Sequence, residues 1–441
     1  MPPKSANFAS KAALSVLSKF AEPSEFSESQ PPRSAATSDQ IHLAFMKSSK
    51  APKGSKLKIV RATTIGSSLE SFCAPMLPYL VDKYDIVAIS NPDDALERIS
   101  NRPGVRAIGV PMQRHIAPLS DLRSLWTMYR TLRRERPWLV HSMTPKAGLI
   151  CMLAACLAGV PNRMHTFTGL IWPTSHGLKR SILKAMDRLL CSCATVINPE
   201  GRGVRDDMVR GGITRRSMVI LGHGNVRGID PEYYNPEDPG VRQTAKTLRQ
   251  DDPEASMVYV FVGRLVADKG IAELVRAFAD VYDKDHGARL WLVGRTEDDL
   301  DPLDKDTRDT IASHPGIRAF GEQADVRPYL VGADAFVFPS HREGFPNVVL
   351  EAGAMGLPSI VTDINGSREI IENHYNGVIV APGDAKALEA AMDTLRDSSV
   401  RARMAGHCRD HVLRYWSASQ VRQALLNFYA GILPGSKTTT R

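Results

Sequence analysis

After position 56, the apolar residues fall in short runs that alternate with longer amphipathic stretches. The runs are rich in β-branched residues, as buried strands are, and cover residues 57–62, 86–89, 106–110, 138–141, 163–167 and 194–198. Stretches with helical spacing separate several of them, at residues 70–83, 120–135, 146–159 and 177–190. This order predicts βαβ units, which build a mainly parallel sheet with helices on both faces.

A loop rich in Gly, Pro and Asn, residues 222–240, is followed by a second alternation. Strands are predicted at 257–262, 289–293, 316–320, 335–338, 358–361 and 377–380, and helices at 269–284, 301–313, 323–331, 347–356, 366–372, 384–396 and 399–431. The fold class is therefore α/β, with two Rossmann-like doubly wound domains facing a central cleft. We expect domains at 56–225 and 250–400, and a C-terminal helix at 401–432 that crosses back towards the N-terminal domain. Ligands gather at the carboxyl ends of the strands that face such a cleft.

Residues 1–55 differ from the rest of the chain. They are rich in Ser, Ala, Pro and Lys, and their apolar residues show no sustained helical or strand periodicity. We therefore interpret them as a disordered or weakly anchoring tail. Residues 11–20 (KAALSVLSKF) have the pattern of a short amphipathic helix, which leaves a surface anchor or a targeting segment as alternatives.

Composition excludes several classes of protein. With 43% hydrophobic and 24% charged residues among 441, the chain is not intrinsically disordered as a whole. Its six cysteines are scattered, which argues against a disulfide scaffold and fits a reducing compartment. No run reaches the roughly 18 apolar residues of a membrane span, and we read the longest candidate, residues 147–160, as a buried helix.

The net charge of +8 is unevenly distributed. Residues 101–220 hold 19 Lys and Arg against 6 Asp and Glu, a net of +13, so the remainder carries about −5. A basic surface of this size favours an anionic partner, either a nucleic acid or an anionic membrane. No nucleic-acid recognition motif accompanies it, so we expect no nucleic-acid partner.

Residues 339–355 (PSHREGFPNVVLEAGAM) follow an apolar strand and carry two glutamates, Glu343 and Glu351. Pro346 suits the first turn of a helix and Asn347 suits its cap. The free N–H groups of a helix that begins there favour an anion such as phosphate. Two carboxylates beside that anion can bind two hydroxyl-bearing parts of one ligand, with Glu351 near the first helical turn. The alternative is that both glutamates only compensate the helix dipole.

Residues 261–270 (FVGRLVADKG) stand at the first strand-to-helix turn of the second domain, where phosphate sites occur in such sheets. Arg264 and Lys269 are both able to reach one diphosphate across that turn. Two cations there would neutralise the charge on a departing nucleoside diphosphate. The alternative is a pair of solvated basic residues.

Taken jointly, these segments resemble the nucleotide-sugar-binding half of family 4 retaining glycosyltransferases. The motifs that match are Gly263-Arg264, Lys269-Gly270, Phe320-Gly321, Asp325-Val326, Phe338-Pro339-Ser340, Glu343-Gly344-Phe345-Pro346, Glu351-Ala352 and Gly356-Leu357-Pro358. The resemblance covers roughly residues 57–430. In the first domain, the segments around His141-Ser142, Thr144-Pro145-Lys146, Phe167-Thr168-Gly169 and Gly177-Leu178-Lys179 look like the branch that acts on polysaccharides and lipid-linked sugars.

The resemblance implies a GT-B fold and a role for each matched residue. Arg264 and Lys269, beside Gly263, would bind the donor diphosphate and stabilise the leaving group. Glu343 would contact the hydroxyls of the donor sugar, and Glu351 those of the ribose. The backbone of Gly344, Phe345, Pro346, Asn347 and Val348 would face the sugar or phosphate, and the base would pack near Arg295, Phe320 and Val326. The resemblance implies neither a metal nor another cofactor.

The first domain departs from the pattern. Many relatives have His-Gly where this chain has Thr168-Gly169, and a threonine is no acid or base near neutral pH. A retaining front-face transfer does not strictly need that histidine, because the leaving phosphate can take the acceptor proton. We read His165, three residues earlier, as structural. Three residues are candidates for the acceptor side: Thr168, Gly169 and Gly66, the only glycine of the loop after the first strand.

Helix 120–135 and segment 170–190 combine apolar and basic residues: Leu122, Leu125, Trp126, Tyr129, Ile171 and Trp172 beside Arg123, Arg130, Arg133, Arg134, Lys179, Arg180, Lys184 and Arg188. Such a surface suits docking at an anionic bilayer. The alternative is that the apolar stripe faces the sheet and the arginines face water. Because the positive charge is concentrated in this domain, we favour the membrane. Lys146 is a candidate contact for an acceptor phosphate, and a buried structural lysine is the less favoured alternative.

These observations predict a retaining, metal-independent glycosyltransferase, peripheral at the cytoplasmic face of a membrane. It would move a sugar from a UDP-hexose or UDP-N-acetylhexosamine to a lipid-linked or polysaccharide acceptor in surface glycan biosynthesis. One alternative is a sugar-nucleotide epimerase or phosphorylase of the same fold. The other is a non-catalytic scaffold protein, against which the intact Arg264, Lys269, Glu343 and Glu351 argue.

Overall fold

In the computed structural model, the described residues are 56–113, 117–297 and 301–432. They belong to one compact unit. The predictions for residues 1–55, including the short helix at 11–20, lie outside the described residues.

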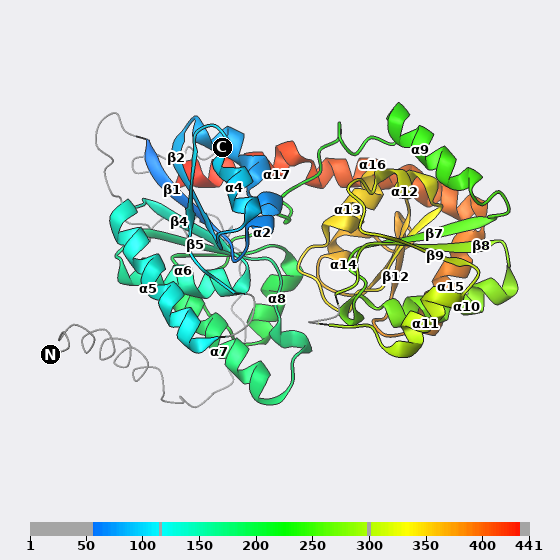
Figure 1. Cartoon of the computed structure of the whole chain (residues 1–441), viewed down its shortest axis with the longest axis horizontal. Coiled ribbons are helices and arrows are strands. Elements are labelled where there is room, and N and C mark those ends of the chain that lie inside the picture. The colour runs from blue at the N-terminus through cyan, green and yellow to red at the C-terminus, as the bar shows by residue number, and fades with distance from the viewer. Residues whose placement is uncertain (1–55, 114–116, 298–300, 433–441) are drawn as a thin grey trace, which may run out of the picture. The chain divides into compact units, whose positions relative to one another are not determined.

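The first sheet is six-stranded and parallel, in the order β3-β2-β1-β4-β5-β6. Figure 1 labels β1, β2, β4 and β5 of this sheet. Its strands are β1 (Leu57–Ala62), β2 (Tyr84–Ser90), β3 (Val105–Gly109), β4 (Leu139–Met143), β5 (Asn162–Phe167) and β6 (Val196–Pro199). The helices are α2 (Gly66–Phe72), η2 (Ala74–Met76), α3 (Leu77–Val81), α4 (Asp94–Ser100), α5 (Pro118–Glu135), α6 (Pro145–Leu157), η3 (Trp172–Thr174), α7 (Gly177–Cys193) and α8 (Arg202–Arg210). All six predicted strands are confirmed, and no strand end differs from its prediction by more than two residues.

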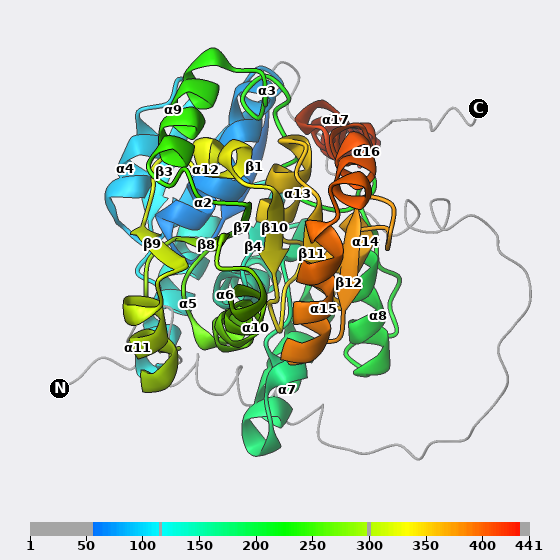
Figure 2. The ribbon, with the colours of Figure 1, turned by 90° about the vertical axis from the view of Figure 1, so that its right-hand side faces the viewer.

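The second sheet is also six-stranded and parallel, in the order β12-β11-β10-β7-β8-β9 (Figures 1 and 2). Its strands are β7 (Met257–Val262), β8 (Ala288–Val293), β9 (Ile317–Gly321), β10 (Ala335–Phe338), β11 (Ser359–Thr362) and β12 (Gly377–Val380). The helices of this part are α9 (Pro239–Gln250), η4 (Ala267–Lys269), α10 (Ile271–Lys284), α11 (Lys305–Ser313), α12 (Arg327–Gly332), α13 (Asn347–Ala354), α14 (Ser367–Ile370), α15 (Ala385–Arg396) and α16 (Ser398–Trp416). Helices α10, α11 and α15 pack together, as do α9 with α12 and α13 with α16.

Both sheets have the same topology. In each, the chain begins with a central strand, adds strands to one edge, and then returns to the centre to add the other three strands. This is the Rossmann order, and the two predicted doubly wound sheets are therefore confirmed. The direction of growth reverses between β1 and β4 in the first sheet and between β7 and β10 in the second. The carboxyl ends of these four strands are the places where a ligand site is expected.

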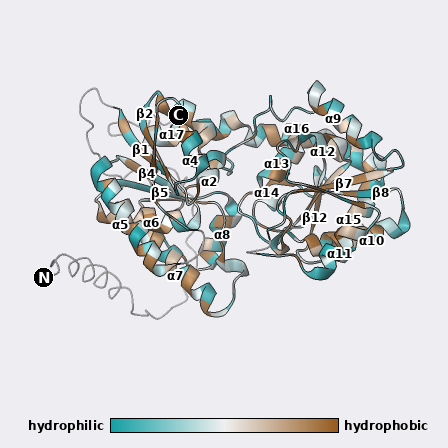
Figure 3. Ribbon diagram, viewed as in Figure 1, coloured by the Kyte–Doolittle hydropathy of each residue, from teal (hydrophilic) through white to brown (hydrophobic). Residues whose placement is uncertain are grey.

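Apolar side chains pack on both faces of each sheet. In Figure 3 the strands are coloured largely as hydrophobic. Along β1 the direction alternates: Ile59 packs with α2, α3 and α4, whereas Val60 packs with α5, α6 and α7. This alternation is the period of two expected of a strand. The final helix α17 (Ala418–Gly431) contributes Val421, Leu425 and Tyr429 to the apolar cluster around Ile59 in the first sheet. Helix α16 contributes Val412 and Trp416 to the core of the second sheet. The C-terminal segment is thus two helices, separated at Ser417, rather than one.

Short helices account for the other differences from the predicted elements. The predicted helix 70–83 is divided into α2, η2 and α3, because prolines at 75 and 78 remove backbone donors and restart the helix. Helices α4 and α8 are seven and nine residues long, and the sequence pattern missed both. Helix α9 lies partly in the predicted loop, since it begins where Asp238 caps the backbone N–H groups of Gly240 and Val241.

Candidate active site

The carboxyl ends of β7 and β10 hold the two motifs that the sequence singles out. The chain leaves β7 at Val262 and reaches α10 through Gly263, Arg264 and η4. It leaves β10 at Phe338 and reaches α13 through residues 339–346. Because β7 and β10 are neighbours and the order of the sheet reverses between them, a crevice is expected at their carboxyl ends. The two loops are in contact, since the His341 N–H donates to the Asp268 carbonyl at 2.8 Å.

A cavity of about 540 Å³ lies between these loops, and we call it the donor cavity. The residues predicted for the donor site that line it are Gly263, Arg264, Lys269, Glu343, Gly344, Phe345, Pro346, Asn347, Val348 and Glu351. The first sheet and its connections add Ser71, Phe72, Thr168, Glu200 and Arg227. The two cations and two carboxylates therefore share one cavity.

Three residues expected around the base do not line this cavity. Arg295 follows β8, and its Nη1 lies 3.8 Å from Glu322 Oε2. Phe320 in β9 and Val326 before α12 pack against the core of the second sheet, with the Phe320 ring 5.7 Å from that of Trp291. They lie in or after β8 and β9, which are on the far side of β7 from β10, and they do not line the cavity.

Each cation of the donor cavity is paired with a carboxylate. The Lys269 ammonium contacts Glu343 Oε1, which also accepts a hydrogen bond from the Ser340 hydroxyl at 3.1 Å. Arg264 contacts Glu297, which lies outside the predicted motifs. A diphosphate bound between Arg264 and Lys269 would compete with these carboxylates for the cations. The pairs hold the cations at the cavity, where they can meet a phosphate group.

Glu351 is held from a part of the chain that sequence analysis missed. Its carboxylate contacts Arg227, which lies in the connection between the two sheets and also lines the cavity. Arg227 Nη2 lies 3.5 Å from the Tyr234 hydroxyl, and burial together with the Glu351 charge raises the pKa of that phenol. Arg227 is 124 residues away from Glu351 in sequence, and no local motif marks it.

Helix α13 begins differently from the prediction. Pro346 occupies the cap position and Asn347 is the first helical residue, so the Asn347 side chain does not cap the helix. Its Oδ1 instead accepts a hydrogen bond from Asn225 Nδ2 at 2.9 Å. Glu351 is the fifth residue of the helix, which places it in the second turn rather than the first. The backbone N–H groups at the start of α13 nevertheless lie beside the donor cavity, since Pro346, Asn347 and Val348 line it.

Two glycines allow loops of the two sheets to touch. A Cβ atom on Gly344 would lie 2.5 Å from the Thr168 carbonyl carbon and 2.6 Å from the Gly169 nitrogen. A Cβ atom on Gly169, which has a φ of 122°, would lie 3.3 Å from the Gly344 nitrogen. A side chain at Gly344 would therefore push the Thr168-Gly169 loop away from the donor cavity. Thr168, which stands where many relatives have a histidine, also lines the donor cavity.

Two family models match the chain. One is described as "Glycosyl transferases group 1" and matches residues 256–398, and the other as "Glycosyl transferase 4-like domain" and matches residues 78–224. The two matches cover most of both sheets. The chain belongs to the GT-B glycosyltransferases.

Curated relatives of this glycosyltransferase extend along most of the chain. The capsular polysaccharide biosynthesis glycosyltransferase CapM of Staphylococcus aureus is 29% identical over 382 residues, which cover 86% of this chain and 98% of CapM. The N,N'-diacetylbacillosaminyl-diphospho-undecaprenol alpha-1,3-N-acetylgalactosaminyltransferase of Campylobacter jejuni is 25% identical over 377 residues, covering 83% of this chain and 97% of the relative. The UDP-Gal:alpha-D-GlcNAc-diphosphoundecaprenol alpha-1,3-galactosyltransferase of Escherichia coli is 26% identical, covering 70% and 79%.

Solved structures agree on the fold of the glycosyltransferase. HepE from Anabaena, in complex with UDP-glucose, superposes with a TM-score of 0.69 at 18% identity, covering 85% of this chain and 99% of HepE. A glycosyltransferase from Rickettsia africae gives a TM-score of 0.69 at 18% identity, with 86% and 100% covered. The GT-B fold predicted from the resemblance is thereby confirmed.

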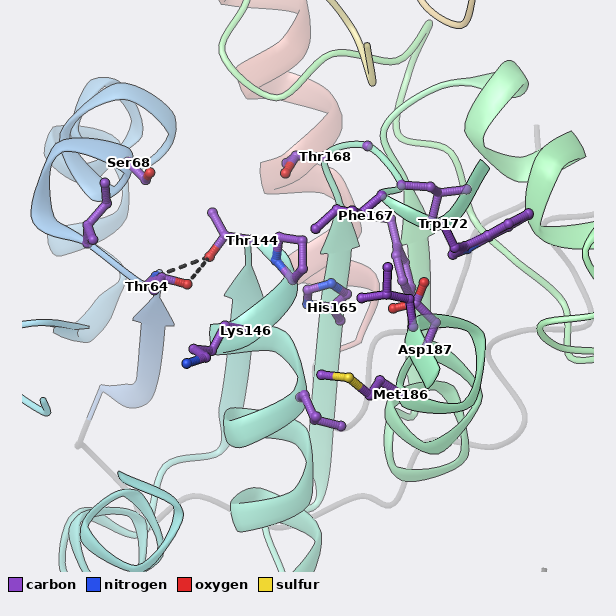
Figure 4. A pocket seen from close by; sticks show the side chains of 17 residues that line it. Thr64, Ser68, Thr144, Lys146, His165, Phe167, Thr168, Trp172, Met186 and Asp187 are labelled. Atoms are coloured by element: carbon purple, nitrogen blue, oxygen red, sulfur yellow. Dashed lines mark hydrogen bonds between the residues drawn. The ribbon is translucent and has the colours of Figure 1, made fainter. Parts of the chain in front are cut away.

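A second cavity of the glycosyltransferase, about 230 Å³, lies at the carboxyl ends of β1, β4 and β5 (Figure 4). Thr64 and Thr144 form one side of it and are joined by a hydrogen bond of 2.8 Å between their hydroxyl groups (Figure 4). Trp172 and Asp187 lie on the opposite side (Figure 4). Thr168 lines this cavity and the donor cavity, so the two cavities adjoin at one residue.

The predicted acceptor-side residues differ in their relation to this second cavity. Lys146 and Gly169 line it, as Thr168 does, whereas Gly66 does not. Gly66 is buried at the start of α2, and its backbone N–H donates to Asp93 Oδ2 at 2.9 Å. The Lys146 ammonium forms an ion pair with Asp121 at 2.7 Å, and its side chain is only 11% exposed. Its surroundings are therefore those of the buried structural lysine, which the sequence analysis favoured less than an acceptor contact.

Burial shifts the pKa of two groups that line the second cavity. His165 accepts or donates one hydrogen bond at Nδ1, 2.9 Å from the Ser142 hydroxyl, and burial lowers its pKa to about 3. It is therefore neutral, which agrees with the structural role predicted for it. Burial raises the pKa of the Asp187 carboxyl to about 7. Asp187 came to light only in the structure, because a single acidic residue in a basic helix carries no sequence signal.

Helices α5 and α7 of the glycosyltransferase expose apolar side chains beside basic ones. Leu122 and Trp126 are exposed, whereas Leu125 and Tyr129 pack against the core, so the stripe on α5 is divided between solvent and the sheet. Leu119 on α5 and Leu178 on α7 are the most exposed, at 86% and 76%. The alternative in which the whole stripe faces the sheet is therefore wrong for Leu122 and Trp126. No helix in the part of the chain that the structure describes is both long and apolar enough to cross a membrane.

Proposed function

We propose that this glycosyltransferase transfers a sugar from a nucleoside diphosphate to a lipid-linked sugar, during assembly of a surface polysaccharide or glycolipid. The donor is a UDP-hexose or UDP-N-acetylhexosamine, the configuration at the anomeric carbon is retained, and no divalent metal takes part. The observation that carries the proposal is the meeting of Arg264, Lys269, Glu343 and Glu351 at one cavity, where the order of the second sheet reverses.

The residues of the donor cavity suit the parts of such a donor. The cations of Arg264 and Lys269 bind the diphosphate, together with backbone N–H groups at the start of α13. Glu343 accepts hydrogen bonds from hydroxyl groups of the sugar, and Glu351, held by Arg227, accepts them from the ribose. The acceptor enters from the second cavity, which adjoins the donor cavity at Thr168.

In the transfer, the bond between the anomeric carbon and the diphosphate oxygen breaks, and a bond from the acceptor hydroxyl oxygen to that carbon forms. The acceptor proton passes to the departing diphosphate on the same face of the sugar, so the configuration is retained. Negative charge grows on the leaving oxygen as its bond breaks. Arg264 and Lys269 stabilise this charge, as a metal ion does in other enzymes.

The relatives support the choice of substrates. The printed names of the Escherichia coli and Campylobacter jejuni relatives describe alpha-1,3 transfer to sugars on diphosphoundecaprenol, and CapM is named for capsular polysaccharide. The structural neighbour HepE is described in complex with UDP-glucose. All of these names are compatible with a nucleoside diphosphate sugar and a lipid-linked acceptor for this chain.

The exposed face of α5 and α7 supports a peripheral position at the cytoplasmic side of the membrane. Its apolar residues are Leu119, Leu122, Trp126, Leu178 and Ile182. Exposed basic residues interleave with them, among them Arg123, Arg130, Lys179 and Arg180. Each basic residue near an anionic lipid surface contributes roughly 1 kcal/mol, and exposed apolar side chains add to the binding.

The proposal is tested with purified protein and a panel of nucleoside diphosphate sugars. We expect one donor to raise the melting temperature and to be consumed only when a lipid-linked sugar is added, with an unchanged rate in EDTA. Conversion of the donor to another sugar nucleotide without acceptor would favour the epimerase. Tight binding of a donor without turnover on any lipid extract would favour a scaffold. Loss of turnover in EDTA that Mg²⁺ restores would contradict metal independence.

A further inference from the structure

Glu200 is a buried acid at the donor cavity that the sequence analysis did not select. It directly follows β6, in the first sheet. Its backbone N–H donates to the Phe167 carbonyl at 3.0 Å, and its carbonyl accepts from the Asn225 N–H at 2.9 Å. The residue is only 4% exposed. The backbone of Glu200 is thus fixed on both sides, and its position at the cavity does not depend on a mobile loop.

Glu200 lines two cavities of the structure. It lines the donor cavity and also a small cavity of about 20 Å³ that Arg61 and His141 line. Among the described residues, none donates a hydrogen bond to its side chain. A buried polar group without a partner is costly, and such groups are nearly always satisfied in folded proteins. A ligand in the donor cavity is therefore the expected partner.

The surroundings of Glu200 favour the uncharged form of its carboxyl. Burial raises its pKa well above the ordinary value, and the negative charges of Glu343 and Glu369 raise it further. Glu369 lies nearby because its carboxylate accepts hydrogen bonds from the Arg202 and Gly203 N–H groups at 2.7 and 2.9 Å. A protonated carboxyl has one O–H donor and a carbonyl acceptor, which suits a hydroxyl or amide group.

Each of the described cations that line these two cavities contacts another group. Lys269 and Arg227 line the same cavity but contact Glu343 and Glu351. Across the small cavity, the fully buried Arg61 donates to the Tyr429 hydroxyl at 2.9 Å. His141 lies there too, and burial keeps its pKa well below the ordinary value. The groups acting on Glu200 are therefore the acids Glu343 and Glu369, which repel a phosphate and leave the diphosphate to Arg264 and Lys269.

We propose that Glu200 binds the transferred sugar of the donor, exchanging hydrogen bonds with one of its hydroxyl or N-acetyl groups from the side of the first sheet. Glu343 binds the same sugar from the second sheet, so the sugar lies between two carboxyl groups from different sheets. Glu200 then helps to determine which sugar the enzyme accepts. This inference rests on the proposed function, because it needs a nucleoside diphosphate sugar in the donor cavity.

The test separates recognition of the sugar from recognition of the nucleotide. The wild type, Glu200→Ala and Glu200→Gln are titrated by calorimetry with the nucleoside diphosphate sugar that the donor panel identifies, and with the matching nucleoside diphosphate alone. We expect all three proteins to bind the nucleoside diphosphate equally. Glu200→Ala should bind the nucleoside diphosphate sugar about tenfold more weakly, the loss expected for one or two hydrogen bonds. Glu200→Gln, which keeps a neutral donor and acceptor, should lose less than Glu200→Ala.

The dependence on pH gives a second readout. As the pH rises and the Glu200 carboxyl ionises, the wild type should lose affinity for the nucleoside diphosphate sugar relative to the nucleoside diphosphate. Glu200→Gln should show no such loss. The control is Glu237→Gln, since Glu237 is exposed, is paired with Arg242 and does not line the donor cavity. It should behave as the wild type at every pH.

The outcomes distinguish this inference from the proposed function. If the wild type binds no nucleoside diphosphate sugar, the proposed function is overturned, and the assignment of Glu200 with it. If the wild type binds one and Glu200→Ala keeps the wild-type ratio of the two affinities, only the assignment is overturned. An unchanged ratio with a raised KM for the acceptor would instead place Glu200 on the acceptor, which also overturns it. Equal binding of the nucleoside diphosphate by all variants shows that the cavity has folded.

Discussion

Lys269 offers the sharpest test of how the donor cavity works. Its side chain is 16% exposed, contacts Glu343 and lies 5.3 Å from the Phe338 ring. Replacing it with alanine removes one of the two cations proposed to hold the diphosphate. Replacing it with glutamine removes the charge but keeps a group that is able to donate a hydrogen bond to Glu343. The pair of variants separates the charge from the packing.

The size of the effect follows from the charge that develops during transfer. Two unit charges 4 Å apart interact by about 4 kcal/mol at an effective dielectric constant of about 20. Part of this attraction exists before the reaction, because the bound diphosphate is already negative. Removing one group that stabilises a developing anion commonly costs about 2.7–4 kcal/mol, a factor of about 10²–10³ in turnover. We therefore expect kcat/KM to fall about 10²–10³-fold in both variants.

Folding should change much less than turnover. Without Lys269, Glu343 keeps the hydrogen bond from the Ser340 hydroxyl at 3.1 Å. The loss of one partner of a largely buried group costs about 1–3 kcal/mol, and Lys269→Gln should cost less than Lys269→Ala. Steady-state transfer rates, calorimetric binding of the donor and thermal unfolding measure the three quantities separately.

The matched control is Lys386→Ala. Lys386 is 78% exposed, forms ion pairs with Asp280 and Glu389, and does not line the donor cavity. It should leave turnover unchanged. A Lys269→Gln protein that folds and transfers sugar within threefold of the wild-type rate would refute the assigned role of the ammonium group.

Three further predictions concern the membrane face, the pH dependence of stability and the C-terminal helix. Substituting Leu122 and Trp126 with serine should weaken sedimentation with anionic vesicles, and high salt should release the wild type, whereas Leu157→Ser should sediment as the wild type does. Relative to the wild type, Glu200→Gln should become more stable as the pH rises above 4.5, because the folded wild type retains a proton on Glu200 that the unfolded chain has lost. Thermal unfolding of both proteins from pH 4 to 8 measures this difference. Tyr429→Phe should destabilise the protein by about 1–3 kcal/mol in urea unfolding, since buried Arg61 and His141 both lose a hydrogen bond.

Each of these three predictions has a contradicting result. Equal sedimentation of the Leu122 and Trp126 variant, or binding that resists high salt, would assign the membrane contact to another part of the chain. A stability difference for Glu200→Gln that is constant with pH would mean that the wild-type carboxyl is ionised in the folded protein. Unchanged stability in Tyr429→Phe, with the exposed Tyr375→Phe as control, would show that the buried hydroxyl contributes nothing.

Strands were predicted more closely than helices, for a physical reason. Buried parallel strands such as β7 are uninterrupted apolar runs, and their limits follow from composition. Helices α8 and α9 bury only two residues each, so their apolar pattern is too short to distinguish from a loop. The periodic pattern of residues 70–83 predicts one helix, but the prolines at 75 and 78 divide it in the structure.

The site was predictable where its residues share a loop, and not where they meet across the fold. Arg264, Lys269, Glu343 and Glu351 stand in two contiguous motifs after strands of one sheet. Arg227 and Glu200 come from the connection and from the first sheet, and only the folded chain brings them to the same cavity. Only the resemblance predicts Arg295, Phe320 and Val326, which lie in or after β8 and β9, away from the switch point.

The central claim is that one cavity between the loops after β7 and β10 holds an activated sugar. The most direct measurement is a crystal structure with the bound nucleoside diphosphate of the preferred donor. The diphosphate should lie within about 3.2 Å of Lys269 Nζ and of the Arg264 guanidinium, with the ribose hydroxyls on Glu351. A nucleotide bound elsewhere, or bound here with its phosphates turned away from both cations, would contradict the account.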